Sequence, residues 1–379
     1  MKFIQRPYEA GDEVNINKLY RLITGRGRNI EEFCWEWIHT WNGQGSMWLA
    51  FDEDREQGDK LIMQYSLIPI PFSFWGKSFL AGKTENCMCH PDCRGKGEYF
   101  QHEKESFKEA KNQFDLFFTT AGDVTKGTVG VIRRKLGYVA FDAWTQYVFC
   151  LNPKYLRILV KSKLQQKNKI FLFLAKGLIT VISHIFVLYF RLQISPRPVA
   201  DIRLFNKHEA PLDEIEHFWN RNKSTYMITV DRHNSYLKWR INQNPYHDYK
   251  YLLYYKDDNL VGYAIYLINN KNSFVITDIL AENRDMSIFS DIVTYLIWNG
   301  KDMAADAVTC GTLVNNEILH DLFSRKKFLN LYKLRKLTES KENTNAFHVY
   351  ISPEINSRKN PLDPRNWYVT DLVKEGRTY

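Results

Sequence analysis

The chain has 379 residues, of which 44% are hydrophobic and 15% aromatic, enough to bury a core in each of two domains. This composition excludes a disordered and a fibrous protein. The formal net charge of +9 favours a polyanionic partner such as nucleic acid, anionic lipid or a phosphorylated cofactor. Because the first residues, MKFIQRPYEAGDE, contain no apolar run typical of a signal peptide, we expect a reduced, cytoplasmic protein.

An internal repeat relates two segments, FCWEWIHTWNGQGSMWLAF at 33–51 and YLKWRINQNPYHDYKYLLY at 236–254. In each, an aromatic-rich helical segment with a tryptophan, Trp37 or Trp239, leads through an Asn-containing turn into an apolar strand. Further strands and a helix follow in both halves, the order of a mixed sheet flanked by helices. We therefore predict an α+β fold made of two related domains.

A glycine-rich junction, HPDCRGKGEYF, follows the strand that we predict at 83–90. Gly95 and Gly97 permit the positive φ angles and the close backbone approach that a phosphate-binding loop requires. The helix that begins here has N–H groups without intrahelical partners at the positive end of its dipole. With Arg94 and Lys96 beside these donors, the junction is suited to bind a pyrophosphate. An ordinary glycine-rich turn is the alternative.

Cysteines near this junction suggest a second possibility, a zinc site. Cys87, Cys89, His90 and Cys93 are close in sequence, but the strand pattern puts His90 on the face opposite to the first two cysteines. No second ligand pair follows at the spacing of a zinc finger. We therefore expect these cysteines to pack as small apolar side chains and expect no metal.

More elements follow in the first half: a buried strand at 112–122, a helix that ends in RRKLGY with Gly137 as its left-handed cap, and a last strand that ends near 150. Here the sequence resembles the GNAT acetyltransferase superfamily, and the likeness covers residues 1–150. Its motifs HPDCRGKG and RKLGY occur in the family's order and separation. The resemblance implies an acetyl-CoA-dependent N-acetyltransferase.

In GNAT enzymes the central strand diverges from its neighbour, and its free backbone groups bind the pantetheine arm of acetyl-CoA. The resemblance implies that the strand around Met88 holds this arm and that the N–H groups after Arg94 hold the pyrophosphate. Glu98 departs from the pattern, because a carboxylate beside a pyrophosphate is repulsive unless it points outward. The cofactor-binding residues implied are Cys87, Met88, Cys89, Arg94, Gly95, Lys96, Gly97, Glu98 and Tyr99.

An amine attacks a thioester only when it is neutral, so the site needs a proton acceptor. We expect Glu85 to be this base, on the same strand face as Cys87 and Cys89; an ion pair with a Lys or Arg of a neighbouring strand is the alternative. Arg133 stands where GNAT enzymes often have the Tyr that acts as acid. By comparison with some tandem members, the carboxylate of the C-terminal Tyr379 is a further candidate base.

An apolar segment at 170–190 is long enough to span a bilayer. Six polar residues in and beside it fall on one narrow stripe of a helix: Lys169, Lys176, Thr180, Ser183, His184 and Arg191. Further lysines precede the segment at 161, 163 and 167. Three interpretations stay open: a helix buried between the domains, a helix lying in the face of an anionic membrane, and a span. In the second interpretation, residues 161–191 make a peripheral contact with the membrane.

The second half lacks the phosphate loop, because AENRDMS at 281–287 has no glycine. We therefore divide the chain into an N-terminal GNAT acetyltransferase domain at 1–152, a connecting helix at 153–198 and a degenerate GNAT-like domain at 199–379.

The expected reaction is direct transfer of acetyl to a small-molecule amine. An amino sugar or a nucleotide-linked sugar in surface glycan synthesis is the leading acceptor, by analogy with similar tandem chains and because aromatic faces suit sugar rings. No nucleic acid partner is expected. Two alternatives remain, an aminoacyl transferase of the tandem-GNAT cell-wall type and a non-catalytic CoA-binding or scaffolding module. The protein is placed in the cytoplasm, with association at the inner membrane face as an alternative.

Overall fold

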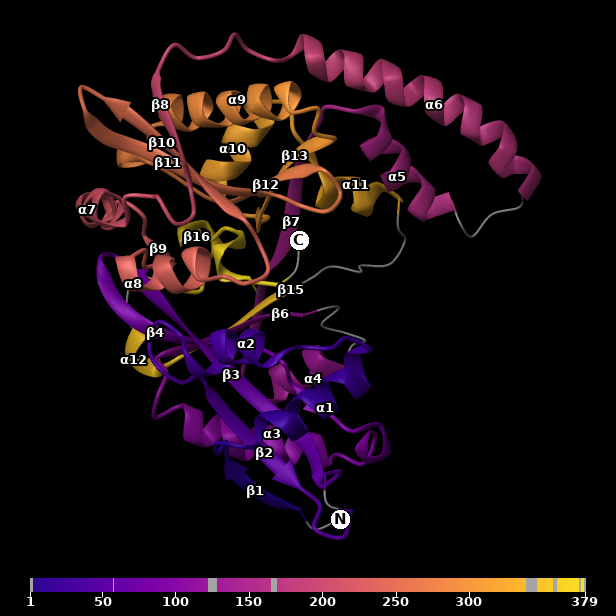
Figure 1. Ribbon diagram of the computed structural model, residues 1–379, viewed down its shortest axis with the longest axis vertical. Coiled ribbons are helices and arrows are strands. Elements are labelled where there is room, and N and C mark those ends of the chain that lie inside the picture. The colour runs from indigo at the N-terminus through magenta and orange to yellow at the C-terminus, as the bar shows by residue number, and fades with distance from the viewer. Residues whose placement is uncertain are drawn as a thin grey trace. The chain divides into compact units, whose positions relative to one another are not determined.

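The computed structural model describes residues 3–56, 58–121, 128–164, 169–338, 346–356, 360–374 and 376–377 (Figure 1). They form two compact units, each built from separate stretches of the chain. Unit 1 comprises 1–143, 227–246 and 343–366, and unit 2 comprises 144–226, 247–342 and 367–379. This division differs from the contiguous ranges expected from the sequence, while the predicted α+β class of mixed sheets flanked by helices is confirmed.

Unit 1 is a mixed sheet in the order β1-β2-β3-β4-β6-β15-β7. Only β4 and β6 are parallel among these neighbours. The strands are β1 (Ile4–Pro7), β2 (Ser46–Phe51), β3 (Leu61–Phe74), β4 (Lys77–Thr84), β6 (Leu116–Ala121), β15 (Ala346–Ile351) and the first part of β7 (Val139–Cys150), with the short β5 (Met88–Cys89) and β9 (Ile228–Val230) paired to β3.

Helices cover this sheet. Every residue of β3 is buried, so both of its faces are covered. Phe107 of α3, Ile132 of α4 and Leu136 just after α4 form one core with Tyr65 and Phe117 of the sheet. The helices of unit 1 are α1 (Glu13–Thr24), α2 (Ile30–Phe33), α3 (Glu98–Ala110), α4 (Thr128–Lys135), α8 (Asn234–Leu237) and α12 (Pro353–Asn356), with two π-helical turns, η1 (Cys34–Ile38) and η3 (Lys238–Asn242), and two 3-10 turns, η2 (Pro91–Cys93) and η5 (Pro364–Asn366).

Strand β7 belongs to both units. Its residues 139–143 pair with β15 in unit 1, and residues 144–150 pair with β13 (Ala307–Leu313) in unit 2. Strand β15 follows the helices of unit 2 in sequence but completes the sheet of unit 1 between β6 and β7. Because the chain passes from one unit to the other in β7 and again before β15, each unit is made of separate stretches of the chain.

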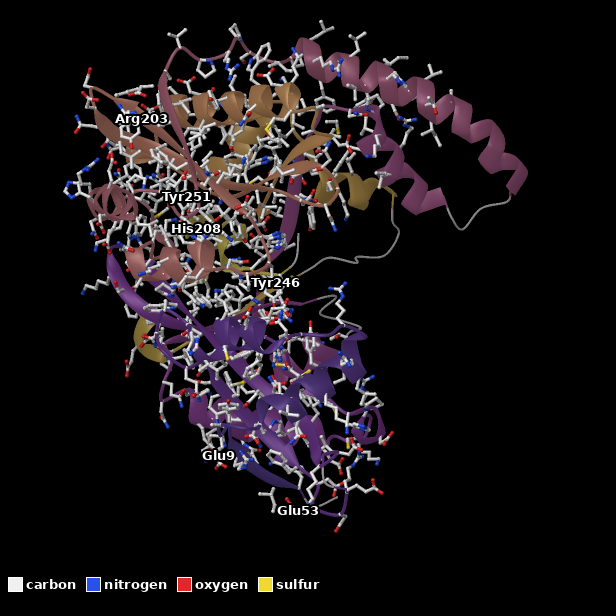
Figure 2. All side chains as sticks on the ribbon, viewed as in Figure 1. Glu9, Glu53, Arg203, His208, Tyr246 and Tyr251 are labelled. Atoms are coloured by element: carbon white, nitrogen blue, oxygen red, sulfur yellow. The ribbon has the colours of Figure 1, made fainter. Side chains whose placement is uncertain are left out.

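The internal repeat appears in unit 1 as a pair of π-helical turns that contact each other. The rings of Trp35 and Trp239 stack with centroids 5.5 Å apart, and Tyr246 (labelled in Figure 2) lies edge-on to Trp35. Each indole N–H donates to the other residue's carbonyl, at 2.9 and 2.8 Å. The counterpart of Trp239 is therefore Trp35; the pairing with Trp37 was wrong because each π-helical turn carries its tryptophan at the second position.

Unit 2 repeats the mixed sheet in the order β7-β13-β12-β11-β10-β8, with β12 and β13 parallel. Helix α9 packs on β11 and β12. The strands of unit 2 are β8 (Asp201–Asn206), β10 (Tyr249–Lys256), β11 (Asn259–Ile268), β12 (Ser273–Ala281), β13, β14 (Leu329–Asn330) and β16 (Trp367–Tyr368). The helical elements of unit 2 are α5 (Pro153–Leu164), α6 (Lys169–Leu192), α7 (Leu212–Asn222), α9 (Met286–Asp302), α10 (Glu317–Arg325), α11 (Leu331–Thr338), η4 (Glu282–Arg284) and η6 (Asp371–Val373).

The predicted apolar helix is α6. Its side chains are described from residue 177, and in that part Ser183, Val187 and Phe190 are buried while many apolar neighbours are exposed. A fully buried helix, one of the three interpretations from the sequence, does not describe these residues. Among the residues that the structure describes, no helix meets the length and apolarity required of a membrane span.

Candidate cofactor-binding site

The parallel pairing of β4 with β6 is short and ends where the two strands separate. Ala81, Gly82 and Lys83 pair with 116–118, and within the described residues the ladder between these strands goes no further. Beyond this point Met88 and Cys89 pair with β3, whereas the end of β6 pairs with β15. We call this end of the ladder the opening between β4 and β6; it lies where the GNAT resemblance implies a pantetheine arm.

A bulge at Asn86, whose φ is +49°, interrupts the strand at this opening. Lys83 lies opposite Ile68 and Met88 opposite Gln64, so the strand has one residue more than β3 over this stretch. Because paired residues share a face and faces alternate along β3, Lys83 and Cys89 lie on opposite faces.

The bulge changes the placement of Glu85. Its carboxylate pairs with the ammonium of Lys83, and both side chains are buried. Cys87 and Cys89 instead pack on two apolar clusters, which Tyr99 of α3 also contacts. The expectation that Glu85 shares a face with the two cysteines was wrong, because strict alternation does not hold across an extra residue. The alternative of an ion pair is present, with a lysine of the same strand rather than of a neighbouring one.

The loop after β5 has the backbone that the sequence predicts. Gly95 and Gly97 have φ angles of +79° and +82°, and a Cβ built on either would meet no atom within 4 Å. The Nε of Arg94 donates to the carbonyl of Cys89 at 3.2 Å, which holds the loop against the end of the strand. Both glycines therefore present open backbone before α3.

Helix α3 begins at Glu98, and its N-cap is Gly97, which has no side chain with which to cap the first turn. Glu98 is half-buried, while Arg94 and Lys96 are exposed. Uncapped N–H groups at the start of a helix, next to two cations, favour an anion.

A buried ion pair lies behind the opening. Arg133 of α4 pairs with Glu103 of α3, and its Nη2 lies 3.6 Å from the sulfur of Cys87. Burial raises the pKa of Tyr99 and of Tyr65 well above the ordinary value for tyrosine, so both stay neutral. Arg133, which stands where GNAT enzymes often have the Tyr that acts as acid, is thus a cation whose ion pair joins α3 and α4.

The sequence analysis missed two buried polar residues of β3, Gln64 and Ser66. The hydroxyl of Ser66 donates to the carbonyl of Glu85 at 2.7 Å, and the N–H of Glu85 donates to the carbonyl of Ser66 at 3.1 Å. Gln64 donates to the Ser66 hydroxyl at 3.0 Å. The available signal was two polar residues, two apart, inside the apolar run LIMQYSLIPI.

Clefts open at two places among the described residues of unit 1. One, of about 770 Å³, lies between α1 and the β2–β3 turn and reaches His90. Burial and the nearby Arg55 guanidinium lower the pKa of His90, which favours its neutral form. The other, of about 480 Å³, is lined by Ile30, Glu31, Cys34, Trp35, His39 and Gln243.

The cysteines next to the loop belong to two apolar clusters, Cys87 to one and Cys89 with Cys93 to the other. Within the described part of the chain, no three His, Cys, Asp or Glu residues are grouped so that they could hold a metal ion.

No protein-family model and no curated protein matches the sequence, so the likeness to known proteins is one of structure. A conserved protein of Enterococcus faecalis V583, described as a probable N-acyltransferase, has a TM-score of 0.61 at 12% identity over 93% of this chain and 73% of its own. A tandem GNAT protein from the clavulanic acid biosynthesis pathway has a TM-score of 0.52 at 9% identity over 92% and 98%. The chain has the tandem GNAT fold.

A GCN5-related N-acetyltransferase from Anabaena variabilis shares this GNAT fold, with a TM-score of 0.58 at 10% identity over 92% of this chain and 73% of its own. At such identities the likeness establishes the fold, and function has to be argued from the site.

The second GNAT-like unit has an opening of its own, which the chain fills. The pairing of β12 with β13 ends at Ile276 and Cys310. Beyond it, Thr312 forms a bridge to Thr370, whose hydroxyl donates to the buried carboxylate of Asp278 at 2.9 Å. A Cβ on Gly311 would overlap the carboxylate of Asp371.

The segment 369–371 therefore occupies the position in unit 2 that corresponds to the separation of β4 from β6 in unit 1. Tyr379, the other candidate base, lies outside the described residues.

Proposed function

We propose that this protein is an acetyl-CoA-dependent N-acetyltransferase that transfers acetyl directly to an amine. The observation that carries the proposal is the separation of β4 from β6 next to an uncapped helix preceded by two open, left-handed glycines. Proteins with this fold are described as a probable N-acyltransferase and as a GCN5-related N-acetyltransferase, which supports the same class of reaction.

In this proposal the backbone of Cys87, Met88 and Cys89 binds the pantetheine arm. The diphosphate lies on the N–H groups from Gly95 to Tyr99, with the cations Arg94 and Lys96 beside it. Main chain makes most of these contacts, because a diphosphate can approach the backbone closely where no side chain intervenes. Glu98 then has to turn away from the phosphates.

Glu85 is proposed as the base. The amine nitrogen attacks the acetyl carbon, the C–S bond breaks, and the proton of the amine passes to the carboxylate while the thiolate leaves. Lys83, Ser66 and Gln64 fix Glu85 through its carboxylate and its backbone. Arg133 is paired with Glu103 and is no proton donor, so positioning of the two substrates supplies much of the remaining acceleration.

The acceptor is proposed to be an amino sugar or its nucleotide-linked form. The cleft of about 480 Å³ is lined by His39 and Glu31, which can bind the hydroxyl groups of a sugar, and is bordered by the largely buried Trp35. A panel of amino sugars, nucleotide-linked amino sugars and aliphatic amines, followed by thiol release from acetyl-CoA, identifies the class.

The Glu85→Gln variant tests the base in that assay. We expect kcat to fall about 10²- to 10⁴-fold, the usual contribution of a general base, with CoA affinity unchanged. Glu105→Gln, an exposed residue of α3, is the matched control and keeps wild-type turnover. Wild-type activity in Glu85→Gln would remove Glu85 from the mechanism, and a wild-type protein that binds no CoA would overturn the whole proposal.

A non-catalytic CoA-binding module is the second candidate. It is favoured by Arg133 at the position of the usual acid and by the close pairing of Glu85 with Lys83. This candidate predicts CoA binding without thiol release for any amine, so the same panel separates it from the enzyme.

A further inference from the structure

Helix α6 of unit 2 turns its apolar face outward. The buried positions Ser183, Val187 and Phe190 follow the helical spacing of one face, and Phe190 packs on Phe149 with ring centroids 5.0 Å apart. In the part of the helix whose side chains are described, 177–192, eight large apolar side chains are between 42% and 75% exposed: Leu178, Val181, Ile182, Ile185, Phe186, Leu188, Tyr189 and Leu192.

These exposed side chains form one continuous row. Leu178, Ile185 and Leu192 recur every seven residues and lie almost opposite the buried Ser183, since each residue of a helix turns by about 100°. The polar His184 and the charged Arg191 lie nearer the buried side. A helix on the surface of a water-soluble domain has the reverse arrangement, with its apolar stripe on the core. Exposed apolar patches of this kind mark surfaces that contact a membrane or a partner.

The sequence around α6 carries the whole net charge of the protein. Residues 143–200 contain nine Lys or Arg and no Asp or Glu. Since the formal net charge of the whole chain is +9, positive and negative residues are equal in number in the rest of the chain. A positively charged segment is complementary to anionic lipid headgroups, which attract Lys and Arg next to a membrane surface. The same charge opposes self-association through α6, because two copies would bring two such segments together.

We propose that α6 docks this protein on the surface of an anionic bilayer. The helix lies parallel to the membrane, its exposed row enters the boundary between headgroups and acyl chains, and the basic residues of the segment contact the headgroups. Its 24 residues, about 36 Å at 1.5 Å per residue, match the length of known interfacial helices. Docking does not depend on the proposed acetyl transfer, so either can hold without the other.

Flotation of the full chain with vesicles tests the docking. With vesicles of 70% phosphatidylcholine and 30% phosphatidylglycerol, we expect most of the protein to float. With pure phosphatidylcholine, or with 0.5 M NaCl present, binding falls at least about tenfold because the electrostatic attraction is lost or screened. Equal binding to both kinds of vesicle, or binding to neither, would overturn the proposal.

A pair of double variants assigns the binding to α6. Ile185→Glu with Leu188→Glu places two charges in the exposed row, at positions 61% and 59% exposed. Leu204→Glu with Met303→Glu makes the same change at other exposed sites of unit 2, at 45% and 49%. The first variant should lose at least about tenfold in vesicle binding while the second floats as the wild type does.

Circular dichroism melting checks that both variants are folded. If the two variants bind vesicles equally, α6 is not the docking surface. A wild-type dimer in sedimentation velocity that the first variant dissociates, without vesicle binding by either, would make the row an interface between copies instead and would also overturn the proposal.

Discussion

The two units contain the same gap between parallel strands and use it differently. In unit 1, β4 separates from β6 beside a loop with two left-handed glycines and an uncapped helix. In unit 2, β12 separates from β13, and the chain's own Thr370 and Asp371 enter the gap. A split strand pair is therefore a property of the fold, and what fills it decides whether it binds a ligand or becomes part of the core.

Backbone groups at such a gap need partners, because buried N–H and C=O groups are costly when unpaired. Unit 2 meets this need internally: Thr312 forms the bridge to Thr370, and its hydroxyl donates to the carbonyl of Val369 at 2.6 Å. In unit 1 the proposed partner is coenzyme A. The difference between the two units predicts one CoA site per chain.

The largest effect is expected at the glycine loop. Gly97→Trp places an indole where the diphosphate is proposed to lie and adds a side chain at a positive φ. We expect CoA affinity to fall at least about 100-fold, which is about 2.7 kcal/mol, in titration calorimetry. Gly11→Trp is the matched control, since Gly11 also has a positive φ and no atom within 4 Å of its Cβ. Similar CoA affinity in both variants would show that CoA binds elsewhere.

The filled gap of unit 2 is tested by Thr370→Val. This change removes the donor to Asp278 at nearly constant shape and leaves a buried carboxylate oxygen without that bond. We expect a loss of about 2 kcal/mol in the free energy of unfolding, measured in urea, with CoA binding unchanged. If this variant instead gains a second CoA site, the segment acts as a displaceable cover rather than as core.

The smallest effect concerns pH and the helix that begins at the loop. His102 of α3 is buried, its Nδ1 lies 2.9 Å from Oε1 of Gln5, and burial lowers its pKa to about 4. The unfolded chain, with an ordinary value near 6.5, takes up this proton first, so stability is lost as pH falls from about 6.5 to about 4.

The expected slope from His102 is about 1 kcal/mol per pH unit in this window. Urea unfolding at several pH values should show a flatter profile for His102→Gln. His208→Gln, at an exposed residue of unit 2 labelled in Figure 2, should keep the wild-type slope. An unchanged slope in His102→Gln would mean that His102 does not contribute.

The sequence predicted the features that depend on local backbone chemistry. Glycines in RGKG indicated positive φ angles, which Gly95 and Gly97 have, and KLGY indicated a left-handed cap, which Gly137 provides with a φ of +89°. The N–H of Tyr138 donates to the carbonyl of Arg133 at 2.9 Å, the bond of a helix terminated in this way.

Features set by distant parts of the chain could not be predicted. The bulge at Asn86 depends on the register against β3, so an alternating pattern placed Glu85 on the wrong face. The insertion of β15 beside β6 and the entry of Thr370 into unit 2 join residues more than 90 positions apart. No short motif encodes such pairings, because they follow from how whole strands compete for one sheet edge.

The diphosphate of coenzyme A is proposed to lie on the backbone before α3, and amide NMR reports on these backbone groups one by one. With the protein labelled by ¹⁵N-glycine, CoA should shift the Gly95 and Gly97 amide signals and leave the Gly311 signal in the filled gap of unit 2 unchanged. Unmoved Gly95 and Gly97 signals in a protein saturated with CoA would contradict the account.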